Sequence, residues 1–500
     1  MKIENCLLKS MKFVPLKGIL AFVLVEFFFH TPLFSQLPTA QQIASQMKVG
    51  WNIVNTLEVP NSSLDAETLW GNPKVNSTLI TAVNHAGFNT IRIPCAWDSH
   101  ANQTTLKIDP NWLQRVNEVV DYCCANNMYV ILNCHWDDGW LENNVTEAMK
   151  DKVNKKQKAY WTQIADCFKD YDEHLLFAGA NEPNVENASQ MAVLMSYHQT
   201  FIDAVRSTGG NNSSRVLIIQ GPSTDIQKTN TYMTAMPVDS ISDRLMVEIH
   251  YYTPWNFCGM TNDESWGKMF YFWGKDNHST TNTSRNPTWG EESTVESYFQ
   301  MMKTKFVDMG IPIILGEYGA TKRSLLTGSD LTLHTASREY FFQYITNAAR
   351  RYGMIPYCWE NDIFNRNNGA VIDHGILNAL IRGATSVTER QESLPAQFSL
   401  KQNYPNPFNP TTLISFSIPS QLVVSLKVYD VFGREVETLW NELTSAGFHE
   451  IHWNAAGLSS GVYFYRLSAM PSAQRDHVLT NGLIVQSGSF SETRKLVLLK

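Results

Sequence analysis

Residues Leu175 to Val185 read LLFAGANEPNV. Five of the first six residues are apolar, which predicts a buried strand, and the segment then changes abruptly to Asn181, Glu182 and Pro183. A carboxylate held away from water costs several kcal/mol unless it is paired or its pKa shifts. Glu182 is therefore either a structural ion-pair partner or a working acid.

A short apolar run followed by a longer helical pattern repeats from Val49 to Trp359. The runs are VGWNIV from Val49, FNTIRIP from Phe88, YVILNC from Tyr129, LLFAGA from Leu175, RVLIIQG from Arg215, LMVEIHYY from Leu245, PIILGEYG from Pro312 and MIPYCW from Met354. Their nearly continuous hydrophobicity suits strands covered on both faces. Eight such units predict an α/β fold, the (β/α)8 TIM barrel. A doubly wound open sheet is the alternative, but no Gly-rich phosphate turn follows the first run.

The composition describes an ordinary globular chain of 500 residues, with 43% hydrophobic and 17% charged residues. The net charge of -7 gives no basic surface, so we expect no nucleic-acid partner. Aromatic residues reach 12%, with 14 Trp, and some of these are available to stack on sugar rings. No HExxH or similar metal-ligand spacing is present, so no metal or cofactor is expected.

The N-terminus carries several lysines, then an apolar run from Ile19 to Phe29 and a small residue, Ser35. This pattern predicts a secretory signal peptide over residues 1–35. A membrane anchor is the rival interpretation, but the run is short for a span of about 20 residues, so we expect no membrane span after processing. Seven cysteines follow, an odd number without a CxxC pair, and most are interpreted as small buried residues.

A composition shift after Arg382 divides the chain. Residues 36–382 are predicted to form the catalytic barrel, and the polar, Pro-containing residues 383–397 a linker. The last segment, 398–500, has β-rich runs separated by Gly and Pro, which predicts a small all-β sandwich.

Polar and aromatic groups follow the predicted strands at their carboxyl ends, where β/α barrels carry their working residues. One such group alone is usually structural, but this many on one rim is hard to explain as packing. They are Arg92, His135, Asn181, Glu182, His250, Tyr252, Glu317 and Trp359.

Two carboxylates across a barrel mouth suit cleavage of a glycosidic bond, because one must be protonated and the other ionised. We expect Arg92 to hold Glu317 ionised as the nucleophile. Glu182, after an apolar strand, is expected to stay protonated with a raised pKa. Asn181 is a candidate to bind a sugar hydroxyl, Tyr252 to touch the nucleophile, and Trp359 to form a stacking floor.

The ordered set IRIP, NEP, HYYTPW, GEYG and CW resembles family 5 of the glycoside hydrolases. The similarity extends to VGWNIVNTLEV, WGNP and HAGFNTIRIPCAW, and covers roughly Ile43 to Arg382. It implies a retaining endo-acting β-glycanase with Glu182 as acid/base and Glu317 as nucleophile. Arg92, His135, Asn181, His250, Tyr252 and Trp359 match other active-site positions. NTLE, which contains Asn55, and WGNP are similar to the branch acting on cellulose, mixed-linkage glucan and xyloglucan, and we include Asn55 among the substrate-binding residues.

The chain departs from many members of the family at Trp136, where a second histidine commonly follows the one that corresponds to His135. Trp136 either lines the cleft or packs under a loop. Trp140 and Trp255 are further candidates for sugar platforms, with local packing as the equal alternative. The long aromatic insert from Phe257 to Glu292 is expected to bind distal glucose units.

The tail motifs NYPNPFNPTT, VYDVFGREV, GVYFYRL and TRKLVLLK resemble the C-terminal sorting domain of type IX secretion. That resemblance implies the type IX machinery as a partner, export across two membranes, and a secreted or cell-surface location in a Gram-negative bacterium. A carbohydrate-binding sandwich, with Trp440 and Trp453 as a binding strip, is the rival interpretation.

The sequence thus predicts a secreted endo-β-1,4-glucanase, a monomer that acts on β-glucan polysaccharide by a two-glutamate mechanism. Another substrate for the same pair, namely xyloglucan, mannan or xylan, is the alternative within the enzyme class. A non-catalytic glucan-binding barrel is the alternative outside that class.

Overall fold

The eight apolar runs all form strands, which close into one parallel barrel in chain order. The strands are β1 (Gly50–Asn52), β2 (Thr90–Ile93), β3 (Tyr129–Asn133), β4 (Leu175–Ala178), β5 (Leu217–Gln220), β6 (Leu245–Tyr251), β7 (Ile313–Tyr318) and β8 (Met354–Cys358). Strand β1 pairs with both β2 and β8, so the sheet has no free edge. The predicted (β/α)8 barrel is confirmed.

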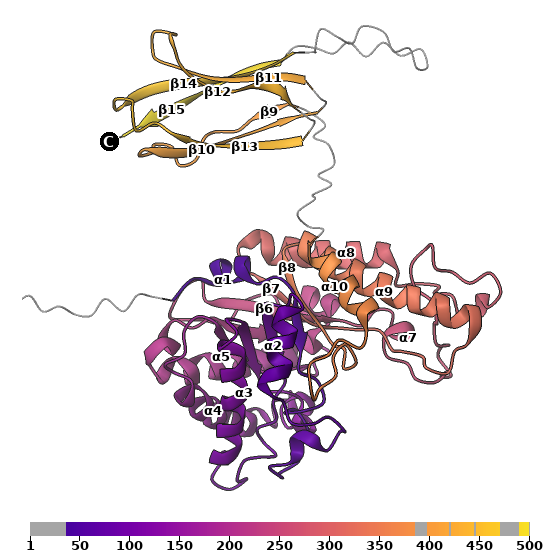
Figure 1. Cartoon of the computed structure of the whole chain (residues 1–500). Coiled ribbons are helices and arrows are strands. Elements are labelled where there is room, and N and C mark those ends of the chain that lie inside the picture. Colours follow the sequence, from indigo (N-terminus) through magenta and orange to yellow (C-terminus); the bar gives the residue numbers. More distant parts are fainter. Residues whose placement is uncertain (1–36, 386–397, 420–421, 445–446, 471–489, 500) are drawn as a thin grey trace, which may run out of the picture. The chain divides into compact units, whose positions relative to one another are not determined.

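This computed structural model describes residues 37–385, 398–419, 422–444, 447–470 and 490–499 (Figure 1). The chain divides into two units, which we describe separately: one contains the barrel and the other a β-sandwich. The predicted signal peptide and residues 386–397 of the predicted linker lie outside the described residues.

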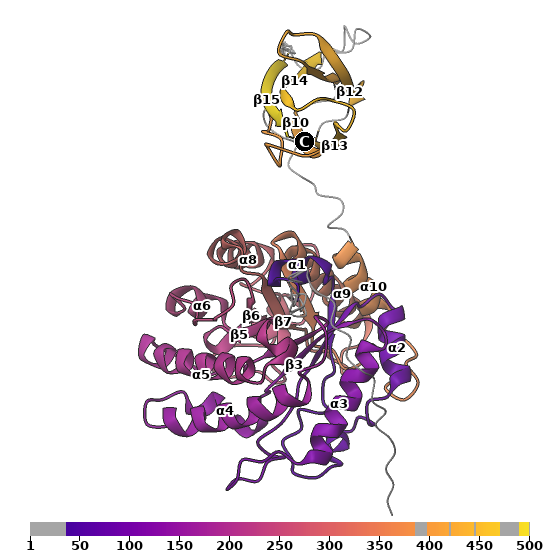
Figure 2. The same ribbon diagram turned by 90° about the vertical axis from the view of Figure 1, so that its left-hand side faces the viewer.

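Helices follow one another around the outside of the strands, as Figure 2 shows for α2 to α6 and α8. Their bounds are α1 (Ala40–Gln46), α2 (Ser77–His85), α3 (Pro110–Cys124), α4 (Lys150–Cys167), α5 (Ala188–Ser207), α6 (Ile226–Tyr232), α7 (Trp255–Cys258), α8 (Glu292–Lys305), α9 (Gly328–Arg351) and α10 (His374–Thr385). Helix α3 illustrates the local cause: Asp109 accepts a hydrogen bond from the Asn111 N–H, and Pro110 occupies the first turn.

The barrel interior is apolar at its amino-terminal end, where α1 closes it. Ile43 of α1, and Met47 directly after it, pack against barrel residues such as Ile131, Leu176 and Ile314. The charged side chains Arg92, His250 and Glu317 instead lie near the carboxyl ends of β2, β6 and β7.

The tail forms two antiparallel sheets around a shared core. Its strands are β9 (Ser399–Leu400), β10 (Thr411–Ile418), β11 (Leu422–Tyr429), β12 (Glu435–Thr444), β13 (Gly447–Asn454), β14 (Gly461–Met470) and β15 (Phe490–Leu498). The sheet orders are β13-β10-β9 and β12-β11-β14-β15. Trp453 is buried in this core and Trp440 packs against it, so neither forms an exposed strip.

Within the described part of the chain, no helix is long and apolar enough to cross a membrane. The seven cysteines in that part are free thiols, and five of them are buried.

Candidate active site

The predicted site residues lie at the carboxyl-terminal rim of the barrel. Arg92 lies one residue before the end of β2, Asn181 and Glu182 follow β4, and His250 and Glu317 lie side by side on β6 and β7. Because all eight strands are parallel, their carboxyl ends meet at one mouth.

Arg92 connects the largest number of these groups and is fully buried. Its Nη1 donates to Asn52 Oδ1 and to Glu317 Oε1, both at 2.9 Å, and its Nη2 donates to Asn181 Oδ1 at 2.7 Å. Its Nε lies 2.9 Å from Glu248 Oε1. A guanidinium with carboxylate and amide acceptors on every side is held in one orientation.

Glu317 is held from two directions. Besides the Arg92 contact, its Oε2 accepts a hydrogen bond of 3.0 Å from the Tyr252 hydroxyl. Its side chain is only 7% exposed, and the exposed part faces the barrel mouth with Glu182. Both oxygens of this carboxylate are therefore held in one orientation.

Glu182 is more open, with its side chain 43% exposed. His250 Nδ1 lies 2.7 Å from Glu182 Oε1, and His250 Nε2 lies 3.3 Å from Glu248 Oε1. Only a protonated imidazole can donate from both ring nitrogens. One oxygen of Glu182 and one of Glu317 lie within 4.8 Å of each other, so the two carboxylates face a common space.

The raised pKa expected for Glu182 is wrong for the ligand-free site, where the pKa of Glu182 is lowered and that of Glu317 is raised. Burial raises the pKa of Glu182, but the hydrogen bond and charge of His250 and the charge of Arg92 outweigh it and lower that pKa. Burial raises the pKa of Glu317, and Glu182 adds to the rise, so His250, Arg92 and Tyr252 only partly offset it. His250 itself is buried, but the adjacent carboxylates raise its pKa to about 9.

His250 is the physical reason for this reversal. The proton expected on Glu182 lies on the imidazole 2.7 Å away, within one hydrogen bond. The Glu182–His250 pair therefore holds one proton, and transfer along that bond produces the neutral acid.

Glu248 is a part of the site that the sequence analysis missed. It is fully buried on β6 between Arg92 and His250, and it accepts a hydrogen bond of 2.7 Å from Gln220 Nε2. A Cβ at Gly316 would lie 2.0 Å from Glu248 Oε1, so the glycine of the GEYG motif leaves room for this carboxylate. The signal was present in LMVEIHYY, where one charge interrupts an apolar strand.

Glu142 was also missed. Its carboxylate accepts a hydrogen bond of 3.3 Å from the Asn181 N–H, and its carbonyl accepts one of 3.0 Å from the Asn184 N–H. Glu142 thus brackets the Asn-Glu-Pro turn and holds Glu182 at the mouth. Its position in a loop of mixed composition gave no signal in the sequence.

His135 and Trp359 line another part of the mouth together. Their rings are stacked, with centroids 5.6 Å apart and planes 6° from parallel. Burial and the charges of Arg92 and His250 lower the pKa of His135 well below its ordinary value, so its imidazole is neutral.

The other predicted binding residues differ in exposure. Trp255 and Trp136 are 50% and 42% exposed, and Trp255 packs edge-on against Tyr252. Trp140 is only 8% exposed and packs edge-on against Tyr160, so it offers little surface to a sugar. The remaining residue, Asn55, lies in a tight turn with a φ of 57°, and its carbonyl accepts a hydrogen bond from Asn72 Nδ2.

Two groups of possible metal donors occur in the described ranges. One is the trio Glu182, His250 and Glu317, and the other is the more exposed trio Asp172, Glu173 and His174. At the first, the guanidinium of Arg92 already neutralises charge 2.9 Å from Glu317. A cation there would face both that group and the protonated His250.

A (β/α)8 barrel with two facing carboxylates, one held by arginine and tyrosine and the other by histidine, has the parts of a glycoside hydrolase. Residues 45–363 match the model of Cellulase (glycosyl hydrolase family 5), and residues 402–480 match the secretion system C-terminal sorting domain. The chain belongs to glycosyl hydrolase family 5, which confirms the predicted family, enzyme class and endo-β-1,4-glucanase type. Its sorting domain confirms the predicted type IX tail and a secreted or cell-surface location.

Relatives extend over most of the barrel unit. Endoglucanase A of Paenibacillus barcinonensis is 34% identical over 69% of this chain and 90% of its own length. The xyloglucan-specific endo-β-1,4-glucanase of Bacteroides ovatus is 35% identical over 69% of this chain and 70% of its own. Among solved structures, a xyloglucan-specific β-1,4-glucanase from a ruminal metagenomic library, in complex with XXLG, is 41% identical. It has a TM-score of 0.64 and covers 69% of this chain and 96% of its own.

Proposed function

We propose that this enzyme cleaves the β-1,4-linked backbone of glucans by double displacement, with Glu317 as nucleophile and Glu182 as acid/base. One oxygen of Glu182 and one of Glu317 lie within 4.8 Å of each other, and this short separation carries the proposal. Retaining glycosidases keep the two carboxyl groups about 5–5.5 Å apart, whereas inverting enzymes need about 6.5–9.5 Å to admit a water.

In the first step, Glu317 attacks the anomeric carbon while the bond to the departing oxygen breaks. Glu182, with the proton it shares with His250, donates that proton to the departing oxygen. In the second step, Glu182 accepts a proton from water, whose oxygen attacks the anomeric carbon and releases Glu317. The Tyr252 hydroxyl and Arg92 stabilise the Glu317 carboxylate as it leaves.

Asn181 is proposed to orient the sugar. Its Oδ1 accepts from Arg92, which directs the amide so that its Nδ2 is available to donate to a hydroxyl beside the scissile bond. Trp359 and Trp255 supply aromatic faces for glucose rings, with Trp136 at the cleft edge. The neutral His135 contributes a ring beside Trp359.

Proton NMR of the first product tests the mechanism. We expect the β-anomer to form first from a β-glucan and then to mutarotate, with Glu317→Gln inactive as the control. Initial release of the α-anomer, or full turnover by Glu317→Gln, would refute the assignment.

Xyloglucan is a second candidate for the preferred substrate, because the 41% identical structure and the Bacteroides ovatus relative are xyloglucan-specific enzymes. Assays on carboxymethylcellulose, barley glucan, xyloglucan, mannan and xylan, at equal enzyme concentration, separate the candidates. A kcat/KM for xyloglucan above that for barley glucan would favour this second candidate.

A further inference from the structure

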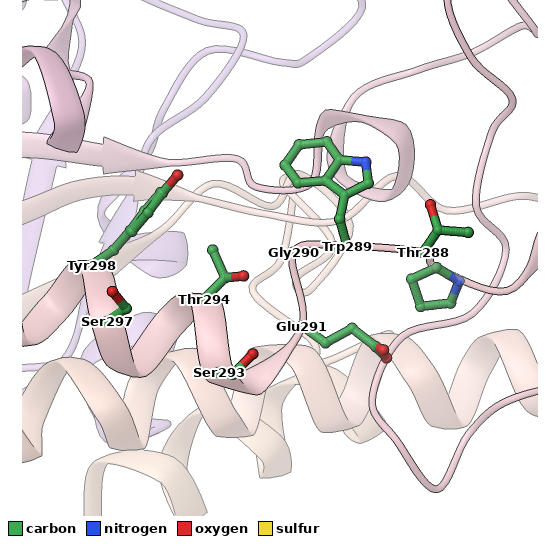
Figure 3. Close-up of a pocket in the computed structure, with 9 residues that line it drawn as sticks. Thr288, Trp289, Gly290, Glu291, Ser293, Thr294, Ser297 and Tyr298 are labelled. Carbon is green, nitrogen blue, oxygen red and sulfur yellow. The ribbon is translucent and has the colours of Figure 1, made fainter.

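A groove of about 490 Å³ lies at the start of helix α8, outside the catalytic residues described above. Figure 3 shows the rings of Trp289 and Tyr298 with Thr294 between them. Trp289 comes from the end of the long insert and is 50% exposed. The hydroxyl side chains of Ser293 and Ser297 also line the groove, as does the carboxylate residue Glu291.

This groove shares one lining residue, Tyr298, with a cavity of the active site. Tyr298 also lines a second cavity, of about 230 Å³, which contains Glu182, His250 and Trp255. Burial and the nearby charge of Asp225 raise the pKa of Tyr298, so its hydroxyl stays protonated and able to donate. The two spaces therefore lie next to each other along the surface of the enzyme.

The position of Glu182 indicates on which side of the cleft the groove lies. Glu182 lines the second cavity, whereas Glu317, His135 and Trp359 do not. Because the acid must face the departing oxygen, the part of the glucan that leaves extends over the side on which Glu182 lies. Trp255 lines the cavity that contains Glu182, Tyr298 lines both spaces, and Trp289 lines only the groove, which is the order a chain leaving Glu182 in that direction would follow.

The segment that carries Trp289 is held in place by buried groups. Gly290 has a φ of +79°, and a Cβ there would lie 2.8 Å from side-chain atoms of Pro254. The fully buried Trp273 donates from Nε1 to the Gly290 carbonyl at 3.0 Å, and Glu291 accepts from the Gly274 N–H at 2.9 Å. The Trp289 ring therefore stands on a fixed backbone, as a preorganised binding surface requires.

We propose that Trp289 and Tyr298 form a distal binding subsite for glucose units of the leaving-group side of the glucan chain. An exposed indole offers a flat apolar face for a sugar ring, and the flanking hydroxyls suit the sugar's equatorial hydroxyl groups. This subsite makes the enzyme favour chains that extend well beyond the scissile bond. The inference rests on the proposed roles of Glu182 and Glu317.

The variant Trp289→Ala tests the subsite with two substrates. Cellohexaose reaches beyond the scissile bond on both sides, whereas 4-nitrophenyl β-cellobioside has only its aryl group on the leaving side. We expect Trp289→Ala to lower kcat/KM for cellohexaose about tenfold, as loss of about one aromatic contact predicts. The rate on the aryl cellobioside is expected to remain within twofold of wild type.

The chain offers a matched control in Trp266, which is 62% exposed in the same insert and lines neither groove. Trp266→Ala should leave both rates unchanged, and Trp289→Phe should recover most of the cellohexaose activity. An unchanged cellohexaose rate in Trp289→Ala, or an equal loss on both substrates, would overturn the proposal. A wild-type enzyme inactive on both substrates would instead reject the proposed function.

Discussion

At the scale of single residues, Arg92 explains why the site is rigid before any sugar binds. Its guanidinium has two carboxylates and two amide oxygens within 2.9 Å, and water has no access to it. In so buried a place a charge is tolerated only with such partners. The arrangement fixes Glu317 and Asn181 relative to each other, so the nucleophile and the amide beside it keep one geometry.

His250 determines which protonation state is active. The proposed mechanism requires a free enzyme with an ionised Glu317 and one proton on the Glu182–His250 pair. Protonation of Glu317 removes the nucleophile at low pH, and because its pKa is raised, this happens above the ordinary value of 4.5. Loss of the pair's proton removes the acid at high pH, and because the pKa of His250 is raised to about 9, this happens near pH 9.

We therefore expect a bell-shaped pH profile of kcat/KM with an alkaline limb near pH 9. In His250→Gln, Glu182 loses the neighbour that shares its proton, so the alkaline limb should move to lower pH. The measurement is kcat/KM on soluble β-glucan from pH 4 to pH 10, with circular dichroism to verify folding. An alkaline limb that stays in place in the folded variant would contradict the role of His250.

The role of Glu182 should be visible in how strongly the rate of a Glu182 variant depends on the leaving group of the substrate. In Glu182→Ala, substrates with poor leaving groups, such as glucan, should lose most of their rate, because protonation of the departing oxygen matters most there. An activated aryl glycoside should lose less, and azide should raise its rate by attacking the glycosyl enzyme.

The measurement is kcat on both substrates with and without azide, with formation of the glycosyl azide followed by NMR. Glu182→Gln serves as the matched variant that preserves side-chain size. Equal losses on both substrates, without any effect of azide, would assign the acid to a different residue.

At the scale of secondary-structure elements, the strands were predictable and their supporting contacts were not. Parallel strands buried on both faces must be apolar throughout, so each run was visible in one sequence. The rim residues were visible because a polar or aromatic group follows most of these runs. Glu142 could not be predicted, because its role depends on the loop after β3 folding back against the turn after β4. No local sequence pattern indicates that contact.

Strand β6 shows that the protonation states of the site cannot be predicted from local sequence alone. The protonation of Glu182 and Glu317 depends on His250, whose charge depends in turn on Glu248 two residues earlier. Side chains two positions apart point to the same face of a strand, so both reach the barrel interior. Their partners on β2, β4 and β7 are defined only once the barrel closes.

Glu248 is consequently expected to stabilise the barrel as well as the site. Glu248→Ala leaves Arg92 with one fewer carboxylate in a buried environment, which should lower the free energy of unfolding by roughly 3–5 kcal/mol. Glu248→Gln keeps the shape and the hydrogen-bond acceptor, so its loss should be smaller. Urea denaturation of both variants measures the difference, and an unchanged unfolding free energy in Glu248→Ala would refute this role.

At the scale of the whole molecule, catalysis and export reside in different units. The barrel unit contains all the predicted site residues, and the tail has a hydrophobic core of its own. The sorting domain was recognisable in sequence because motifs such as NYPNPFNPTT and TRKLVLLK resemble it, whereas the alternating strands alone predicted only a small sandwich. Its rival function, glycan binding through Trp440 and Trp453, loses its basis because these rings contribute to the core.

Removal of residues 386–500 should therefore leave kcat/KM on soluble glucan within twofold of the full chain, while it abolishes export. The reason is that the barrel's catalytic contacts all lie before residue 386, whereas the sorting signal lies after it. The measurement compares activity in the medium and in the periplasm of a host with type IX secretion.

A reporter carrying residues 1–37 and 386–500 provides the converse test. It should reach the medium in that host and remain in the periplasm of a mutant without type IX secretion, whereas a reporter without the tail should remain there in both. Retention of the tailed reporter on cellulose without export would assign the sandwich to binding. Loss of glucanase activity in the truncated enzyme would show that the barrel needs the tail.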